Sequence, residues 1–351
     1  MPPLYLTIQG SKLCFRGRRF VVEKDEQIVM TVPAVHVDQV LIFGNIALTT
    51  PAIAHLLDQS IEVTFLTQDG RYRGRLVGPE GGNGLLRLRQ YQRVLDPAWA
   101  FETARAIVVG KLHNARALLR RYARRRREEE MGEEEVSTAC PLSPVLSSAA
   151  DELDRLIEQT GRCQSINSLS GVEGRGAAVY FGVFRTLITM PGWPFDGRNR
   201  RPPRDPVNAL LSFGYTVLLH NLESAVRAVG LDPYLGFLHQ PAYNRPSLAL
   251  DLAEEFRSIV VDSVVLRCIN NRIVLPEMFR RDPVPGAPYP ILLNEEGRAR
   301  FIRELEARLA LEFRHPDSEE RVTYRRCFEL QARRMVRCIQ NGEIYRPFKV
   351  R

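Results

Sequence analysis

The hydrophobic pattern of the chain changes near residue 80, and this change limits the folds that the sequence can adopt. Up to that point, β-branched and other apolar residues form short stretches between turn residues, which is typical of strands. These stretches are residues 5–8, 28–32, 37–43, 61–66 and 71–76. Asp69-Gly70 predicts a tight turn before the last strand. Residues 50–57 predict one short helix, with Pro51 near its start.

From about residue 97 the apolar residues recur every three or four positions, as they do on one face of a helix. The expected helices are residues 100–122, 149–159, 173–187, 208–229, 248–268, 295–313 and 323–341. The sequence therefore predicts an α+β protein. It divides into a β-rich domain at residues 1–77, a linker at 78–96 and a larger α-helical domain at 97–351.

Composition narrows the class of protein further. The chain has 351 residues, 44% of them hydrophobic and 26% charged, which excludes a disordered chain, a collagen-like fibre and a small disulfide scaffold. We find no apolar run of the roughly 18 residues needed to cross a bilayer, and no secretory signal at the start. We therefore expect a cytoplasmic protein with no membrane partner.

Positive charge is concentrated at the end of the chain. The net charge is +8, and residues 321–351 hold nine cations against two acids. A basic segment of this kind is typical of nucleic-acid contacts. The hypothesis is that five arginines hold DNA phosphates, namely Arg325, Arg326, Arg333, Arg334 and Arg337. The alternative is that they coat the outer face of a terminal helix.

Three acids lie in an otherwise apolar helical segment. Asp251, Glu254 and Glu255 follow His239 by 12 to 16 positions. Carboxylates on a buried helix are costly unless they are paired with cations or hold a metal ion. The alternatives are structural ion pairs with arginines such as Arg257 and a metal site, and spacing does not choose between Glu254 and Glu255.

A third candidate acid is Glu173, which lies among glycines at 171, 174 and 176 and is expected near the start of a helix. An acid at that position ordinarily stabilises the helix by interacting with the positive end of its dipole. Taken together, Glu173, His239 and Glu254 would suit one Mg²⁺ or Mn²⁺ ion. A site of this type suits phosphodiester chemistry.

Several motifs in a fixed order resemble those of one known family, the CRISPR-associated adaptation integrases. The sequences GFLH at 236–239, RPSL at 245–248 and DLAEEFR at 251–257 carry the resemblance most strongly. Further agreement comes from VEGRGA at 172–177, the segment at 201–215 and the arginine-rich tail. The likeness extends over nearly the whole chain.

The resemblance implies an N-terminal β-sandwich-like domain that dimerises and an all-α catalytic domain. It places the family's metal ligands on Glu173, His239 and Glu254, with Asp251 and Asn208 in supporting positions. It implies a homodimer, bridged to a second one by a small ferredoxin-fold subunit, that acts on double-stranded and branched DNA. The implied reaction is metal-dependent transesterification, in which prespacer 3′-hydroxyls are joined to a CRISPR repeat, with DNA hydrolysis as the related endonuclease activity.

Two other functions fit the same residues. One is a non-catalytic nucleic-acid-binding scaffold whose acids are only ion-paired. The other is a stand-alone branched-DNA repair nuclease, which the sequence does not distinguish from an integrase.

Overall fold

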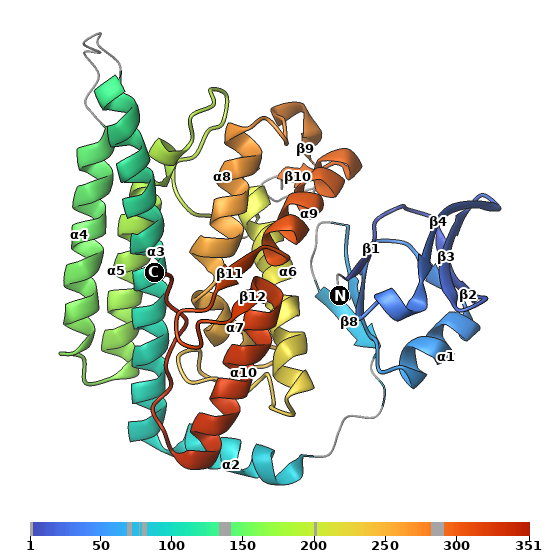
Figure 1. Ribbon diagram of the computed structural model, residues 1–351, viewed down its shortest axis with the longest axis horizontal. Coiled ribbons are helices and arrows are strands. Elements are labelled where there is room, and N and C mark those ends of the chain that lie inside the picture. Colours follow the sequence, from blue (N-terminus) through green and yellow to red (C-terminus); the bar gives the residue numbers. More distant parts are fainter. Residues whose placement is uncertain are drawn as a thin grey trace.

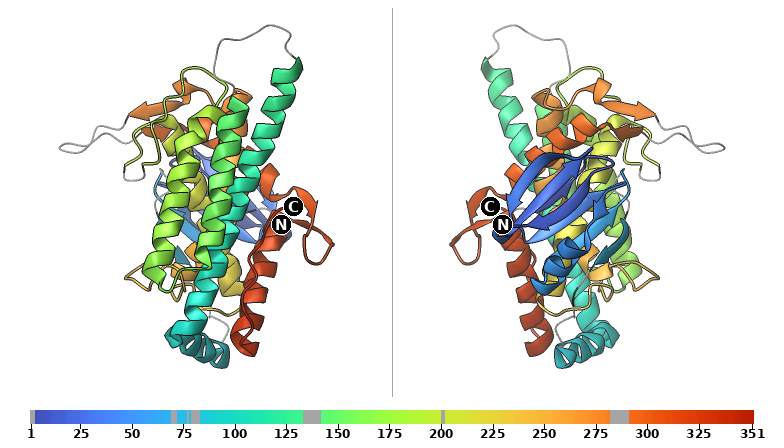
Figure 2. Two further views of the ribbon diagram at one scale, coloured as in Figure 1. Left: turned by 90° about the vertical axis from the view of Figure 1, so that its left-hand side faces the viewer. Right: turned by 90° about the vertical axis from the view of Figure 1, so that its right-hand side faces the viewer.

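The computed structural model describes residues 3–68, 72–76, 78, 83–132, 142–199, 202–281 and 291–351. Its first part contains two four-stranded sheets that share one core (Figures 1 and 2). Sheet one has the order β1-β5-β7-β8, and its strands are β1 (Leu4–Leu6), β5 (Gln39–Phe43), β7 (Glu62–Leu66) and β8 (Tyr72–Leu76). Sheet two has the order β4-β3-β2-β6, and its strands are β4 (Gln27–Pro33), β3 (Arg19–Lys24), β2 (Lys12–Arg16) and β6 (Ala47–Leu48).

Strand β5 lies inside sheet one between two parallel neighbours, β1 and β7. All five of its residues are therefore buried. The sequence prediction missed β2 and β3, which form a hairpin. Their two-residue turn places Gly17 and Arg18 at positive φ, as tight hairpins require. Helix α1 (Thr50–Asp58) is confirmed, whereas the Asp69-Gly70 turn lies outside the described residues.

The second part of the chain is largely helical. Its helices are α2 (Gly84–Leu95), α3 (Pro97–Gly132), α4 (Leu142–Thr160), α5 (Ile166–Phe184), α6 (Pro206–Ala228), α7 (Ser247–Glu254), α8 (Ser263–Asn270), α9 (Glu295–Leu309) and α10 (Tyr324–Asn341). Helix α2 occupies most of the expected linker. Two short ribbons depart from the all-α expectation, β9 (Phe279–Arg281) with β10 (Ile291–Leu293), and β11 (Glu312–Arg314) with β12 (Arg321–Thr323).

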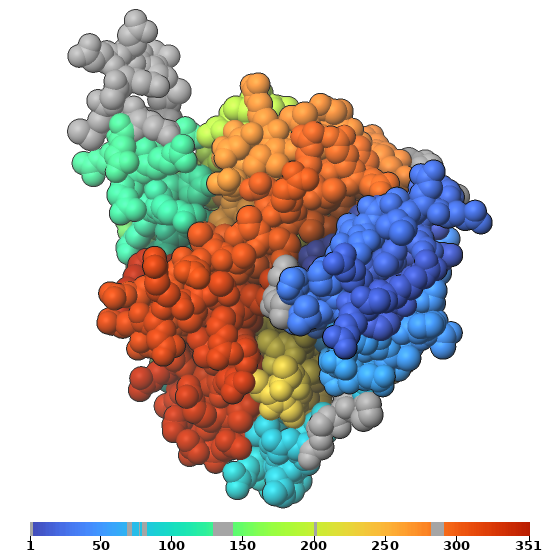
Figure 3. All heavy atoms as spheres, turned by 45° about the vertical axis from the view of Figure 1, so that its right-hand side comes forward, coloured from blue at the N-terminus to red at the C-terminus, as the bar shows by residue number. Residues whose placement is uncertain are grey.

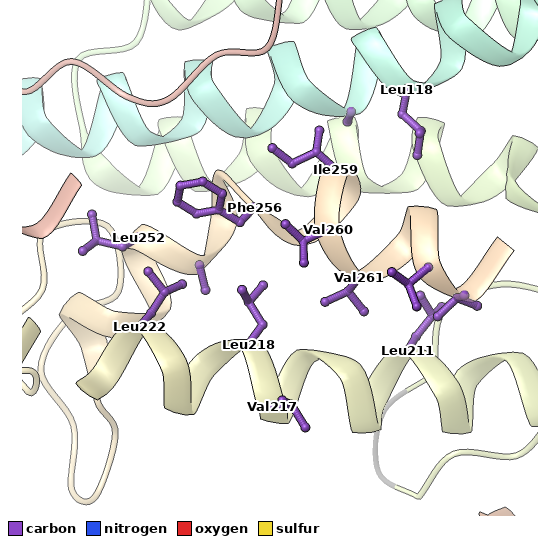
Figure 4. Close-up of a cluster of buried hydrophobic side chains, with 14 of the residues drawn as sticks. Leu118, Leu211, Val217, Leu218, Leu222, Leu252, Phe256, Ile259, Val260 and Val261 are labelled. Atoms are coloured by element: carbon purple, nitrogen blue, oxygen red, sulfur yellow. The ribbon is translucent and has the colours of Figure 1, made fainter. Parts of the chain in front are cut away.

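The core of the helical part lies between α3, α6 and the segment from α7 to α8. Figure 4 shows Leu118 of α3, Leu218 and Leu222 of α6, and Phe256 and Val260 directed toward one another. The first sheet packs against this part, where the rings of Phe43 and Phe213 lie 5.5 Å apart. Figure 3 shows the N-terminal part (blue) seated against the helices. Across the described residues, none of the helices is both long and apolar enough to cross a membrane.

The expected single helix at 248–268 is interrupted directly after Glu254. A π-helical segment, η3 (Arg257–Asp262), separates α7 from α8. The wider turn leaves the carbonyl of Ile259 available to Arg308, whose Nε and Nη2 donate to it at 3.0 and 2.6 Å. The interruption allows the acids at the end of α7 to face different neighbours.

Glu255 anchors the C-terminal tail rather than facing the same side as Glu254. Its carboxylate accepts hydrogen bonds from the hydroxyl of Tyr345 at 2.7 Å and the amide of Phe348 at 2.7 Å. The Asn114 side chain donates to the backbone oxygens of Glu255 and Phe348. The tail is therefore tied to α3 and to the end of α7.

The stability of the protein should depend on pH through Glu255. Burial raises the pKa of Glu255 to about 7, against an ordinary value of 4.5, despite the hydrogen bonds that lower it. Its contribution to stability is therefore full below pH 4.5 and declines as the pH rises to about 7. In Glu255→Gln, the free energy of unfolding should fall less steeply with pH, by up to about 1.4 kcal/mol per pH unit. Urea unfolding between pH 5 and 7 measures it, and equal slopes for both proteins would contradict the prediction.

Candidate active site

Residues far apart in the sequence meet where α3, α5 and α7 pack together. Glu173 belongs to α5, Glu254 ends α7, and His239 lies in the loop before α7. The expectation that Glu173 lies near a helix start is wrong. Helix α5 begins at Ile166 behind a capping box of Ser165 and Ser168, so Glu173 is two turns inside it.

Lys111 of α3 links the two glutamates. Its ammonium contacts Oε1 of Glu173 and lies 2.6 Å from Oε2 of Glu254. The side chain of Lys111 is 15% exposed and that of Glu254 is 3% exposed, so this is a largely buried cluster. Sequence reasoning missed Lys111. The available signal was a lysine on the apolar face of the helix, beside Val108 and Leu112.

Glu254 is held in its charged form by surrounding cations. Burial alone would raise the pKa of Glu254, but Arg257 and Lys111, with His239, outweigh it and lower the pKa to about 2. Nη2 of Arg257 lies 3.1 Å from Oε1 of Glu254. Oε2 accepts no hydrogen bond of good geometry, so its attraction to the Lys111 ammonium is chiefly electrostatic. Charge attraction of this kind tolerates angles at which a hydrogen bond would be weak.

Asp251 fixes the direction of His239. The carboxylate of Asp251 is fully buried and accepts hydrogen bonds from the amides of Phe237, Leu238 and His239 at 2.6 to 3.0 Å. It also lies 2.7 Å from Nδ1 of His239. The contact of Nδ1 with Asp251 directs Nε2 toward Oε1 of Glu254, which lies 3.9 Å away. Asp251 thus supports the site without belonging to its inner contacts.

Asp251→Asn should weaken metal binding more than it alters the fold. An amide offers one oxygen to four donors and turns its NH₂ group toward some of them, so the His239 loop loses its anchor. We expect Mn²⁺ affinity to fall about 10- to 100-fold. Isothermal titration with Mn²⁺ measures the loss. An affinity equal to that of the unmodified protein would show that His239 needs no such support.

Asn208 does not contact the site residues directly and is connected to them only through other side chains. Its Oδ1 accepts from Nη1 of Arg198 at 2.7 Å, and the Arg198 guanidinium lies over the ring of Tyr215. Arg257 lies near the same ring, 5.0 Å from its centroid, and contacts Glu254. Asn208 therefore organises the loop before α6 and the cations behind Glu254.

Most of the tail arginines have acidic partners within the chain. Arg325 donates twice to Glu306, Arg326 and Arg333 pair with Glu329, and Arg334 pairs with Asp317. Among the described residues, no hydrogen bond or ion pair is found for the side chain of Arg337. The charge of α10 is thus partly neutralised before any nucleic acid approaches.

The inner residues suit a divalent metal ion. Within the described ranges, no three His, Cys, Asp or Glu side chains already converge as a metal site. The ammonium of Lys111 contacts both carboxylates and occupies the position between them that a metal ion would take. Two carboxylates and one imidazole nitrogen are ligands suited to Mg²⁺ or Mn²⁺. Glu173, His239 and Glu254 can therefore hold such an ion if the lysine moves aside.

The fold and these residues define a class of protein, a two-part α+β protein with an acid-and-histidine site between its helices. Residues 4–307 match the family model described as CRISPR associated protein Cas1. The chain is 36% identical over 349 residues to a Thermus thermophilus protein named CRISPR-associated endonuclease Cas1 3, covering 99% of this chain and 95% of that protein. The chain belongs to the Cas1 family.

A second relative is a longer protein. The chain is 39% identical over 349 residues to a Geobacter sulfurreducens protein named CRISPR-associated exonuclease Cas4/endonuclease Cas1 fusion. The match covers 97% of this chain and spans 59% of the fusion. This relative therefore carries a further portion that the chain does not match.

Solved structures show the same fold. A CAS1 protein from Thermotoga maritima superposes with a TM-score of 0.78 at 23% identity, covering 98% of this chain and 99% of that one. A chain of a Cas6-RT-Cas1–Cas2 complex gives 0.80 at 26% identity, covering all of this chain and 36% of that one. A casposase bound to an integration product gives 0.81 at 22% identity, covering 98% and 92%.

Proposed function

We propose that the chain is a metal-dependent DNA integrase and endonuclease of CRISPR adaptation, acting in the cytoplasm. Its reaction would join the 3′-hydroxyls of a prespacer to a CRISPR repeat. The observation that supports the proposal is that Glu173 and Glu254 share the Lys111 ammonium, while Nε2 of His239 lies 3.9 Å from Oε1 of Glu254. The names of the relatives, endonucleases of the Cas1 family, agree with it.

Each inner residue has a separate task in this proposal. Glu173, His239 and Glu254 would hold Mg²⁺ or Mn²⁺, and Asp251 would keep His239 directed at it. When bound, such an ion activates the attacking oxygen and stabilises negative charge on the phosphate. Arg257 keeps Glu254 ionised, and Lys111, once displaced from between the two glutamates by the ion, would offer a second positive charge to the reacting phosphate.

The reaction balances as a single exchange of bonds. The prespacer 3′-hydroxyl gives up its proton to solvent and its oxygen bonds to a phosphorus of the repeat, while the bond between that phosphorus and the adjoining 3′-oxygen of the repeat strand breaks. The leaving oxygen takes up a proton and becomes a new hydroxyl. Hydrolysis is the same exchange with water as the attacking group, which gives the endonuclease activity.

The proposed assembly is a homodimer, two copies of which are bridged by a small ferredoxin-fold subunit and bind prespacer and repeat DNA. One of the similar solved structures is a Cas6-RT-Cas1–Cas2 complex. Edge strand β4 supports self-association, because Ile28 is 63% and Val29 46% exposed. Exposed apolar side chains on an edge strand favour contact with another chain.

A strand-transfer assay tests the proposed function. The chain is combined with the partner subunit, Mn²⁺, a supercoiled repeat plasmid and a labelled prespacer. We expect label to become joined to nicked plasmid when the prespacer ends in a 3′-hydroxyl, and no joining with dideoxy ends. A protein that binds this DNA tightly but never joins label would support the non-catalytic scaffold instead. Joining that does not need the partner or a repeat would favour the repair nuclease.

The proposed role of the tail arginines has its own test. Because four of them already have acidic partners, DNA must compete for these guanidinium groups. Replacing Arg326, Arg333 and Arg337 with Gln should reduce the slope of log affinity against log salt by about 2 to 3. Filter binding to duplex DNA at several salt concentrations measures the slope. A slope equal to that of the unmodified protein would assign these arginines to the surface of α10 only.

A further inference from the structure

A hollow separate from the acid-and-histidine site opens between the C-terminal half of α3, helix α8 and helix α9. Its volume is about 460 Å³, which lies in the range of pockets that hold small organic ligands. Arg121 and Arg125 line it from α3, Arg267 from α8, and Glu304 and Arg308 from α9. None of these residues has a task in the proposed reaction.

The lining of the hollow carries excess positive charge. Apart from Arg125, which has an interaction of its own, its described residues include three arginines and a single acid, Glu304. That acid is already paired, because its Oε2 accepts from Nε of Arg267 at 2.7 Å. The lining therefore has no second carboxylate to balance the guanidinium groups of Arg121 and Arg308.

Arg308 shows that this imbalance extends below the surface. Its hydrogen bonds go to neutral groups, the carbonyl of Ile259 and, at 3.1 Å, the hydroxyl of Tyr324. Its guanidinium also lies 4.7 Å from the centroid of the Tyr324 ring. Burial, together with the charge of Arg121, lowers the pKa of Arg308. A half-buried cation next to another cation would be stabilised by an anion in the hollow.

The remaining walls are apolar and aromatic. Val264, Leu266 and Leu311 line the hollow, and Leu311 is 47% exposed at its rim. The ring of Tyr122 also lines it, with the Arg121 guanidinium 5.9 Å from the ring centroid. A surface that pairs guanidinium groups with an aromatic ring suits a ligand with both a phosphate and a flat base.

We propose that this hollow binds a segment of single-stranded DNA, with phosphates on Arg121 and Arg308 and a base against Tyr122. The proposal rests on the proposed function, which requires a DNA strand to reach Glu173 and Glu254. Arg121 lies ten residues beyond Lys111 on the same helix, a separation of roughly 15 Å. A strand held in the hollow could therefore continue along α3 to the reacting phosphate.

Oligonucleotide binding without metal tests the site apart from the chemistry. Fluorescence anisotropy of a short labelled oligothymidylate is measured in EDTA with the full chain. Arg121→Gln removes one phosphate contact, and Ala307→Leu narrows the hollow while leaving every arginine in place. We expect each to weaken binding at least about fivefold. Arg155→Gln, at an exposed arginine of α4 paired with Glu152, is the matched control and should bind as the unmodified protein does.

Photocrosslinking provides a second readout. An oligonucleotide with iodouracil in place of thymine should attach at Tyr122 or at the segments beside it. Unchanged affinity in both Arg121→Gln and Ala307→Leu, or crosslinks confined to α10, would overturn the inference. If binding depends on Arg121 but the chain never transfers strands in Mn²⁺, the proposed function fails and the DNA site stands. If strand transfer is normal but oligonucleotide binding does not depend on Arg121, the proposed function stands and the DNA site in the hollow fails.

Discussion

Glu254→Gln is expected to reduce Mn²⁺-dependent strand transfer by about 10²- to 10³-fold. The carboxylate is 3% exposed and fully charged among Lys111, Arg257 and His239, so the neutral amide removes the strongest anionic ligand of the site. Glu173→Gln and His239→Ala should cause losses of similar size. Initial rates of strand transfer with saturating DNA measure the effect.

A matched control separates this loss from a general effect of removing an acid. Glu152 of α4 pairs with Arg155 and Arg175 at the surface of the neighbouring helices. Glu152→Gln should leave the rate within about twofold, because exposed ion pairs contribute little. Full activity in Glu254→Gln would assign the buried acids to structural ion pairs and support the scaffold function.

Lys111→Met is expected to destabilise the metal-free protein by roughly 2–4 kcal/mol. The substitution leaves the buried carboxylate of Glu254 with only Arg257 and His239 for compensation, and it leaves Glu173 without its cation. Mn²⁺ should restore much of this loss, because the ion supplies the missing charge. The Mn²⁺ affinity of the variant should rise, since no ammonium has to be displaced.

Urea unfolding in EDTA and in excess Mn²⁺ measures both parts of this prediction. Lys12→Met is the control, because the Lys12 side chain is 49% exposed and its buried partner Glu23 keeps a second cation, Arg16, at 2.7 Å. That variant should lose less than about 1 kcal/mol in either condition. An equal loss for Lys111→Met with and without Mn²⁺ would show that the lysine and the metal do not share one point.

The fold class could be predicted because hydrophobic periodicity is local. The change from short apolar stretches to helical spacing correctly separated the sheets from the helices. Strands β2 and β3 were missed because Lys12–Arg16 and Arg19–Lys24 carry charged ends and a turn without the usual Asn-Gly signal. The interruption after Glu254 was missed because it depends on tertiary partners, Arg308 on Ile259 and Tyr345 on Glu255.

The site was only partly predictable for a related reason. Spacing alone left Glu254 and Glu255 equivalent, whereas the structure directs Glu254 to Lys111 and Glu255 to the tail. Lys111 lies 62 residues before Glu173, so nothing in the local pattern relates them. Family resemblance supplied the choice of Glu254, and packing of α3 on α5 and α7 supplied the lysine.

Mn²⁺ titration of Glu254→Gln against Glu255→Gln tests the central claim most directly. The two variants change adjacent carboxylates by the same few atoms, and only Glu254 faces Lys111 and His239. Isothermal titration should give one Mn²⁺ site per chain in the unmodified protein and in Glu255→Gln, and at least about 100-fold weaker binding in Glu254→Gln. Equal Mn²⁺ affinity in the two variants would contradict the assignment of the site.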